Sequence, residues 1–325
     1  LALVGEMLTD STFPEKEFDT LKQQRLAGLE NMKNEPQALA PLAVQRKLSQ
    51  YPKGDPRYIP TVPEQIEGTQ AVTRDQAFEF YKKYYGVAAG ELSVIGDFDS
   101  EELQKQVTSL LGAWKSPAHY ARIVSSYKPS PAGAETIETP DKANAMWFAG
   151  ITMQLRDSDP DYPALALGNY LLGEGMNSRL FARVRGKEGL SYGVGSQVVV
   201  PAMGNMALFV AYAICAPENA PKVEAAFKDE LSQVLDKGYS DAEIAAAKKS
   251  WREARQVSRA NDSELSSQLA SHVYNNRNMA FDAQLEQKVQ ALTADQIRVV
   301  MKKYLDPAKM TYGRAGDFKK KNITW

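Results

Sequence analysis

The sequence predicts an α+β protein built from tandem homologous domains, each an antiparallel sheet backed by helices, with the first copy truncated. One observation behind this prediction is an internal repeat, and another is the alternation of strand-like apolar runs with amphipathic helices. The composition agrees, because 43% hydrophobic residues, 24% charged residues and a net charge of −1 are typical of a globular protein. A chain of 325 residues is long enough for about two domains.

The repeat aligns residues 72–98 with residues 292–318 without a gap, at an offset of 220. The copies read VTRDQAFEFYKKYYGVAAGELSVIGDF and LTADQIRVVMKKYLDPAKMTYGRAGDF. Thr73 and Thr293 are each placed to cap an amphipathic helix, with an acid two residues further on. Each copy therefore predicts a helix, a turn and an apolar strand that ends at Gly-Asp-Phe.

The repeat also predicts the domain boundaries. Only about 115 residues precede the Pro-rich stretch, although a full first copy would need about 220. We therefore expect residues 1–115 to be the C-terminal half of a first domain, residues 116–140 a linker and residues 141–325 a complete second domain. Leu1 lies in an apolar-periodic stretch without an initiator Met or a signal segment, which suggests a chain cut from a longer one.

The second domain is expected to place its helices on one face of an antiparallel sheet. A helix with Pro160 near its start leads to the Gly173-Glu174-Gly175 turn, and a short helix capped by Asn177 or Ser178 follows. The C-terminal part is mostly helical. The expected strands are 145–152, 191–200, 207–216 and 310–315.

Several functional classes are disfavoured by composition and by missing motifs. The balanced charge argues against nucleic acid, and the longest apolar run, 208–215, is too short to span a bilayer. The single cysteine, Cys215, excludes an internal disulfide and is expected to be a buried thiol. His119 and His272 lie far apart, and the chain has no His-x-x-Glu-His, His-Glu-x-x-His, CxxC, phosphate loop or nucleophile elbow. We therefore expect no metal site in this chain and disfavour a small-molecule enzyme.

Two features could contact a peptide. Gly173-Glu174-Gly175 could present backbone N–H groups to an anion or a peptide carbonyl, although a tight helix-to-helix turn explains the same residues. The strand at 145–152 could pair with an extended peptide along its edge, with no particular residue assigned.

Residues 175–196, GMNSRLFARVRGKEGLSYGVGS, carry a more specific pattern. Ser178-Arg179-Leu180, followed by Arg185-x-Lys-Glu-x-Leu-x-Tyr192, resembles the non-metal domain of the pitrilysin/insulinase-type zinc metallopeptidases. These are inverted zincins of the mitochondrial-processing-peptidase-like superfamily, also described as metallopeptidases with a LuxS/MPP-like fold. The resemblance extends to the Phe13-Pro14 helix start, the Tyr51–Tyr58 loop and both Gly-Asp-Phe strand ends.

The resemblance implies the C-terminal, non-metal half of a zinc metalloendopeptidase that encloses and hydrolyses unstructured peptides. Zinc would be bound outside this chain, because the third zinc ligand of the family falls here at Gly28, with Glu30 out of register. The partners implied are a peptide substrate and a metal-bearing N-terminal half, on the same polypeptide or on a second subunit, and a dimer is compatible with both. The chain alone is expected to be inactive.

The resemblance assigns catalytic roles to Arg185 and Tyr192, which would stabilise negative charge on the scissile carbonyl oxygen. Gly173, Gly175 and Ser191 are expected to bind substrate. The alternative interpretation makes Arg185 a helix-terminal cation and Tyr192 a sheet aromatic.

A rival hypothesis is a catalytically inactive binding or scaffold subunit of the same superfamily. The resemblance also suggests a periplasmic or cell-envelope location, which the sequence itself leaves unknown.

Overall fold

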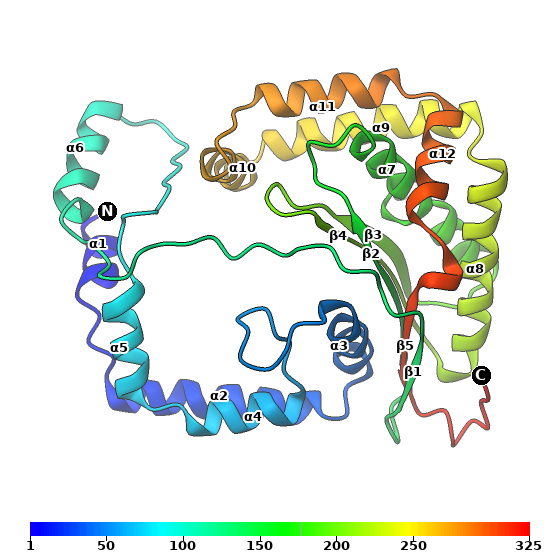
Figure 1. Cartoon of the computed structure of the whole chain (residues 1–325), viewed down its shortest axis with the longest axis horizontal. Coiled ribbons are helices and arrows are strands. Elements are labelled where there is room, and N and C mark those ends of the chain that lie inside the picture. Colours follow the sequence, from blue (N-terminus) through cyan, green and yellow to red (C-terminus); the bar gives the residue numbers. More distant parts are fainter. Residues whose placement is uncertain (176) are drawn as a thin grey trace. The chain divides into compact units, whose positions relative to one another are not determined.

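The computed structural model describes residues 1–175 and 177–325 (Figure 1). Its contacts divide into two compact units, each assembled from separate stretches of chain. Unit 1 comprises Leu1–Glu30, Val62–Ile123 and Val257–Met279, and unit 2 comprises Asn31–Thr61, Val124–Gln256 and Ala280–Trp325. The domain boundaries expected from the repeat stay a prediction.

The α-helices are α1 (Ala2–Thr9), α2 (Glu15–Met32), α3 (Pro36–Ser49), α4 (Val62–Ala71), α5 (Arg74–Tyr84), α6 (Ser100–Leu111), α7 (Tyr162–Asn169), α8 (Ala220–Lys237), α9 (Asp241–Arg259), α10 (Asp262–Tyr274), α11 (Ala280–Ala291) and α12 (Ala294–Tyr304). Shorter helical elements are the π-helical η1 (Tyr170–Glu174) and η2 (Phe181–Lys187) and the 3-10 turns η3 (Pro217–Asn219) and η4 (Pro307–Lys309). The strands are β1 (Gly133–Glu138), β2 (Ala145–Gln154), β3 (Gly193–Val199), β4 (Met206–Cys215) and β5 (Thr311–Gly316). The predicted α+β class is confirmed, and the four expected strands are found as β2 to β5.

Within unit 2 the described strands form one sheet in the order β1-β5-β2-β4-β3. All neighbours are antiparallel except β1 and β5, which are parallel. β1 lies inside the range expected to be a linker. β2 is paired on both sides, so the hypothesis that it offers an edge to a peptide was wrong.

Both faces of the sheet are covered by helices (Figure 1). Side chains alternate along a strand, so Trp147 faces the core shared with α7, α8 and α12, whereas Met146 and Phe148 face α3. The expectation that helices cover one face was therefore wrong for α3. The cause is β2 itself, whose residues are buried on both faces and need apolar cover on both.

A buried ionic cluster joins β2, β5 and α8 in unit 2. The Glu224 carboxylate accepts hydrogen bonds from Trp147 Nε1 at 2.9 Å and from Arg314 at 2.6 and 2.8 Å. Lys228 Nζ adds a further bond at 2.7 Å. Burial alone would raise the pKa of Glu224, but the hydrogen bonds from Arg314, Lys228 and Trp147 together outweigh it and lower the pKa.

The two copies of the repeat share local geometry. Thr73 and Thr293 cap α5 and α12, as the sequence predicted, and each also forms a capping box, with Gln76 and Gln296 respectively. In both copies a lysine of a long helix, α2 or α9, caps the C-terminal end of the second helix after it, α4 or α11. In the first copy Lys22 Nζ donates to Gln70 O and Val72 O at 2.8 Å each. Lys248 Nζ donates to Gln290 O at 2.8 Å and Leu292 O at 2.7 Å. The repeat is therefore present in three dimensions.

The copies differ where the first was expected to form a strand. Residues 311–316 are β5, whereas their counterparts at 91–96 have no strand conformation. A strand requires a partner for its backbone N–H and C=O groups, and no described strand of unit 1 lies beside residues 91–96. The prediction of a strand in the first copy was wrong for this reason.

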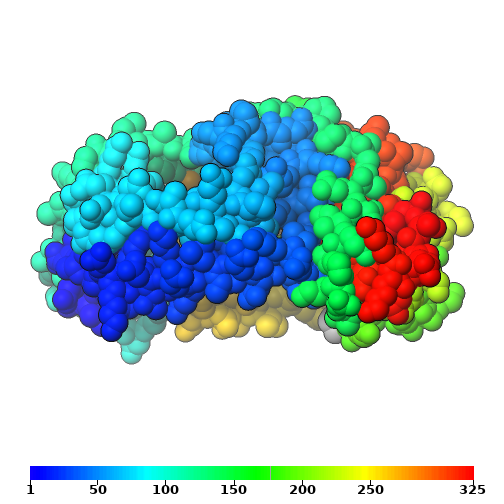
Figure 2. All heavy atoms as spheres, turned by 90° about the horizontal axis from the view of Figure 1, so that it is seen from below, coloured from blue at the N-terminus to red at the C-terminus, as the bar shows by residue number. Residues whose placement is uncertain are grey.

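Unit 1 contains helices and irregular segments, with no strand among its described residues. α2 and α4 lie side by side, as Figures 1 and 2 show, joined by the Lys22 cap and by a bond from Arg25 to Gln65 at 3.3 Å. Phe13, Phe78 and Tyr81 form an aromatic cluster between the start of α2 and α5, with ring centroids 5.4 to 6.2 Å apart. This cluster fixes α5 against the segment that joins α1 and α2.

We expect Glu224→Gln to lower the free energy of unfolding by about 3 kcal/mol, because it leaves Arg314 buried without its partner. The folded-state pKa of Glu224 lies below the unfolded value of 4.5, so its stabilising contribution is present above that pH and is lost as the pH falls through the folded pKa. Urea unfolding as a function of pH measures both effects. Glu218→Gln is the control, since Glu218 is half-exposed and lies 3.6 Å from Lys321. Equal stability of the two variants would contradict the prediction.

Gly313→Ala is expected to destabilise unit 2 by about 1–3 kcal/mol, because a Cβ there would overlap the Ala40 carbonyl of α3. Gly28→Ala is the matched control in α2, where a Cβ meets nothing within 4 Å. That change should stabilise the chain by about 0.5–1 kcal/mol, since alanine favours helix over glycine. Thermal unfolding of both variants gives the sign of each effect, and destabilisation by both would refute this account of α3 packing.

Candidate functional site

The residues that the sequence singled out lie on or next to two helical segments beside β3. η1 ends at Glu174, and a second helix begins at Arg179 and continues through η2. Both segments contain wide turns: the Gly175 N–H donates to Tyr170 O at 2.9 Å, and the Glu188 N–H donates to Arg183 O at 2.9 Å. Such π-helical turns are rare in proteins overall. Those that do occur often lie at functional sites.

Apolar side chains anchor both segments to the sheet. Leu172, Leu180 and Val184 are fully buried in the core that includes β2 and β4. Ser178 was expected to be able to cap the second helix, but its buried Oγ has no hydrogen-bond partner among the described residues. Asn177 forms no side-chain hydrogen bond within residues 1–175 and 177–325, and Met176 lies outside the described residues.

Gly173 and Gly175 have a packing role that the structure shows directly. A Cβ at Gly173 would overlap Ser196 of β3, and a Cβ at Gly175 would lie 3.0 Å from the Tyr170 ring. The Gly175 N–H already donates within the chain, so it is not free for a ligand. Substrate binding by these glycines stays a prediction.

Ser191 holds the start of β3 against β4. Its Oγ lies 2.6 Å from Gly193 O and 2.7 Å from Ile214 O, and it accepts the Gly193 N–H at 3.1 Å. The residue is buried. The contact of Ser191 with substrate stays a prediction. Its hydroxyl already forms hydrogen bonds with main-chain groups of β3 and β4.

Two arginines of the motif are bound to carboxylates. Arg179 donates to Glu243 at 2.8 and 3.0 Å and stacks on Tyr239, with its Cζ 4.8 Å from the ring centroid. The hydrogen bonds from Arg179 lower the pKa of Glu243 to about 2. Arg183 pairs with Glu188 at 2.8 Å and also contacts Asp229. These two side chains fix the second helix to α8 and α9.

Arg185 differs from both. Its side chain is exposed, its Cζ lies 5.1 Å from the Phe181 ring centroid, and it forms no ion pair within residues 1–175 and 177–325. A cation over an aromatic face gains modest stabilisation and stays accessible to a ligand.

Tyr192 is also accessible, with 69% of its surface exposed. Its backbone N–H donates to Ile214 O at 2.9 Å, which fixes the main chain beside β4 while the ring extends into solvent. Gly189, with φ of 61°, permits the reversal between Arg185 and Tyr192. The structure places both residues at one helix-to-strand joint, and no hydrogen bond or cation–ring contact joins their side chains in the described part of the chain.

The sequence did not identify a buried polar group beside this joint. Asn169, only 1% exposed, donates from Nδ2 to Glu174 Oε2 at 2.9 Å and accepts the Ser196 hydroxyl at 2.8 Å. Desolvation raises the pKa of Glu174 despite the Asn169 bond. The signal available in the sequence was an asparagine at the end of the apolar run Ala-Leu-Ala-Leu-Gly.

No group of three His, Cys, Asp or Glu residues that could hold a metal ion occurs among the described residues. Cys215 is buried as expected, and burial raises the pKa of its thiol to about 12. None of the described helices is long and apolar enough to cross a bilayer.

Two bacterial relatives illustrate the similarity to curated proteins. An uncharacterized zinc protease of Streptomyces coelicolor is 30% identical over 186 residues, which is 56% of this chain and 40% of that protein. The probable inactive metalloprotease YmfF of Bacillus subtilis is 27% identical over 157 residues, 47% of this chain and 35% of that protein. The chain therefore spans two fifths or less of the length of these relatives.

Solved structures share the fold. A peptidase M16 inactive domain from Pseudomonas fluorescens has a TM-score of 0.78 at 24% identity, covering 96% of this chain and 73% of that one. The periplasmic protease PqqL from Escherichia coli has a TM-score of 0.65 at 17% identity, covering 93% of this chain and 33% of that one.

The family model described as the peptidase M16 inactive domain matches residues 71–250, more than half of the chain. This match confirms the metallopeptidase resemblance that the motif at 178–192 indicated. The chain belongs to the peptidase M16 inactive-domain family.

Proposed function

We propose that this chain is the non-metal half of a zinc metalloendopeptidase and supplies Arg185 and Tyr192 to the active site of the complete enzyme. One observation carries the proposal. Of the three arginines in the motif, Arg179 and Arg183 are held by carboxylates, whereas Arg185 is exposed without an ion pair among the described residues. Tyr192, at the same joint, is 69% exposed.

These two groups have the chemistry that peptide hydrolysis requires. Attack by water on a peptide carbonyl builds negative charge on the carbonyl oxygen, and a guanidinium and a phenol O–H can both donate hydrogen bonds to it. Such donors accelerate the reaction when they are positioned before the charge develops. Zinc, bound outside this chain, would activate the attacking water.

The substrate class in this proposal is unstructured peptide, enclosed between this chain and a metal-bearing half. That half is either part of the same polypeptide or a second subunit, and a dimer of the complete enzyme is compatible with either arrangement. Support comes from the relatives, which are two to three times longer than the part of them that this chain matches and of which one is named a zinc protease.

A cell-envelope location is part of the same proposal. It is supported by the periplasmic protease among the structural neighbours, whose fold this chain shares. Fractionation of the source cells tests it, and recovery of the parent protein in the cytosolic fraction alone would exclude it.

A second candidate is a catalytically inactive scaffold subunit of the same superfamily. The name of the Bacillus subtilis relative, a probable inactive metalloprotease, favours it. The two candidate functions differ in whether Arg185 and Tyr192 affect the rate of peptide hydrolysis.

Arg185→Ala and Tyr192→Phe are each expected to lower kcat of the parent enzyme on an unstructured fluorogenic peptide by about a hundredfold or more, because each removes one donor to the oxyanion. Lys187→Ala is the matched control, since Lys187 is an exposed cation on the same helix. Thermal stability should be unchanged in all three variants because the side chains are exposed. Full activity of both Arg185→Ala and Tyr192→Phe would support the scaffold candidate instead.

Metal removal provides an independent check. A chelator should abolish peptidase activity of the parent enzyme, and zinc should restore it. Metal analysis of the 325-residue chain should find no stoichiometric zinc, and this chain alone should not hydrolyse the peptide. Chelator-resistant hydrolysis would refute zinc-dependent catalysis.

A further inference from the structure

The turn between η1 and the second helix presents a carboxylate that no described cation neutralises. Glu174 is exposed, and it forms no ion pair within residues 1–175 and 177–325. The carboxylates that contact the second helix differ, because its arginines Arg179 and Arg183 hold them. They belong to Glu188, Asp229, Glu230 and Glu243. Glu174 is therefore available to a cation that this chain does not supply.

A buried amide fixes the direction of the Glu174 carboxylate. Asn169 Nδ2 donates to Glu174 Oε2 at 2.9 Å, and Asn169 Oδ1 accepts the Ser196 hydroxyl at 2.8 Å. Asn169 and Ser196 are only 1% and 4% exposed. A neutral donor orients a carboxylate but leaves its charge in place, and desolvation raises the pKa of Glu174 because no described cation offsets it.

The helix that ends at Glu174 adds to the preference for a cation. α7 and η1 are continuous in the chain from Tyr162 to Glu174. The last carbonyl groups of a helix carry partial negative charge, which attracts cations. The Gly175 N–H, a group that attracts anions, already donates to Tyr170 O at 2.9 Å. The turn was expected to bind an anion or a carbonyl oxygen, whereas its charges favour a positively charged ligand.

β3 connects this carboxylate to Tyr192. Ser196, which is bonded to Asn169, lies four residues after Tyr192 in the sequence. A strand rises about 3.3 Å per residue, so the two main-chain positions are about 13 Å apart. An extended peptide covers the same distance with about four residues. One side chain of a bound peptide can therefore reach Glu174 while its scissile bond lies at Tyr192.

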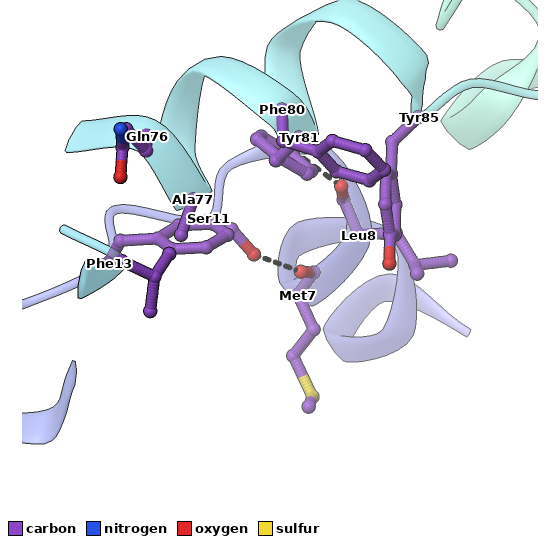
Figure 3. Close-up of a pocket in the computed structure, with 10 residues that line it drawn as sticks. Met7, Leu8, Ser11, Phe13, Gln76, Ala77, Phe80, Tyr81 and Tyr85 are labelled. Carbon is purple, nitrogen blue, oxygen red and sulfur yellow. Dashed lines mark hydrogen bonds between the residues drawn. The ribbon is translucent and has the colours of Figure 1, made fainter. Parts of the chain in front are cut away.

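Two described pockets lack such a carboxylate. The pocket between α1 and α5 in unit 1 is apolar, as Figure 3 shows, and no charged residue is among the described residues that line it. A pocket beside the second helix has acidic walls, but Arg179 and Arg183 occupy their charges. Its acidic residues are Glu188, Asp229 and Glu230.

We propose that Glu174, positioned by Asn169, is a subsite for a cationic side chain of the peptide substrate, a lysine or an arginine about four residues from the scissile bond. The ammonium or guanidinium group donates hydrogen bonds to the Glu174 carboxylate at the C-terminal end of η1. The inference rests on the proposed function, because it takes a peptide as the ligand of this joint. Asn169 is a positioning residue, since it is buried and acts through Glu174.

The test uses the parent enzyme and pairs of internally quenched, unstructured peptides. One member of each pair carries a single lysine in an otherwise neutral sequence, and the other carries acetyl-lysine, a neutral analogue, at the same position. The position is moved from one to six residues away on each side of the scissile bond, and mass spectrometry verifies the cleavage site. We expect kcat/KM to be about tenfold higher for lysine than for acetyl-lysine at about four residues, chiefly through KM.

Variants of Glu174 identify the group that reads the charge. Glu174→Gln keeps an acceptor for Asn169 and removes the charge, so it should reduce the ratio of the two kcat/KM values to about one. Glu174→Lys should transfer the preference to a glutamate at the same peptide position, which a merely structural role would not produce. Glu218→Gln is the matched control, because Glu218 is a half-exposed carboxylate of the same unit. The ratio should stay at about ten in that variant.

The same peptides separate this inference from the proposed catalytic role. Arg185→Ala should lower kcat on both members of a pair and leave their ratio at about ten. A ratio of one at every position, in a parent whose kcat falls in Arg185→Ala, would overturn the subsite alone. An unchanged ratio in Glu174→Gln, or a preference confined to the residues that flank the scissile bond, would also overturn it.

If the parent hydrolyses none of the peptides, the proposed catalytic role fails and equilibrium binding tests the subsite. Fluorescence anisotropy then compares the lysine and acetyl-lysine members of each pair. Binding that is about tenfold tighter for lysine, and equal in Glu174→Gln, would support the subsite. Equal affinity of the parent for both members at every position would overturn it.

Discussion

The burial of β2 on both faces is the constraint on which unit 2 depends. Nine of its ten residues are buried, so the strand cannot lie at a surface or at an edge of the sheet. It is stable only because β4 and β5 satisfy its backbone and helices cover both of its faces. α3 is therefore as necessary to this sheet as α7 or α8, although it lies about a hundred residues earlier in the chain. Gly150 and Gly313 make its close approach sterically possible.

The candidate site follows from the way in which the sheet ends at β3. η1 and the second helix pack their apolar side chains against β3, and the small residue Gly173 allows η1 to reach it. With the helices fixed in this way, Arg179 and Arg183 form ion pairs with carboxylates of α8 and α9. Arg185, two residues after Arg183, has no such partner among the described residues and remains available. Preorganised electrostatic stabilisation requires donor groups that are held by a rigid surrounding structure and are free to bind a ligand, and Arg185 and Tyr192 have this arrangement.

The sequence predicted much of this fold from local signals. Apolar strand-like runs located β2 to β5, and the capping threonines Thr73 and Thr293 located the starts of α5 and α12. The sequence also located the joint that carries Arg185 and Tyr192.

The sequence could not predict that α3 covers the sheet, because that contact joins residues far apart and has no local signature. Nor could it separate Arg185 from Arg179 and Arg183, since the difference lies in which carboxylates α8 and α9 bring near. Asn169 was missed for the same reason: its partners Glu174 and Ser196 become visible only when η1 packs on β3.

The repeat separates what a sequence encodes locally from what its surroundings supply. Both copies keep their capping box and their lysine cap, because every partner in those bonds lies within the same copy of the repeat. Only the second copy keeps its strand, because a strand needs a neighbour, and only residues 311–316 have one among the described residues. Phe98 and Phe318 show the consequence for burial. Each ends a Gly-Asp-Phe sequence, but the Phe98 side chain is 45% exposed and the Phe318 side chain only 2% exposed. The caps at these helix ends are therefore determined within one copy of the repeat, whereas the strands and the buried aromatic residues depend on the sheet that the rest of the chain provides.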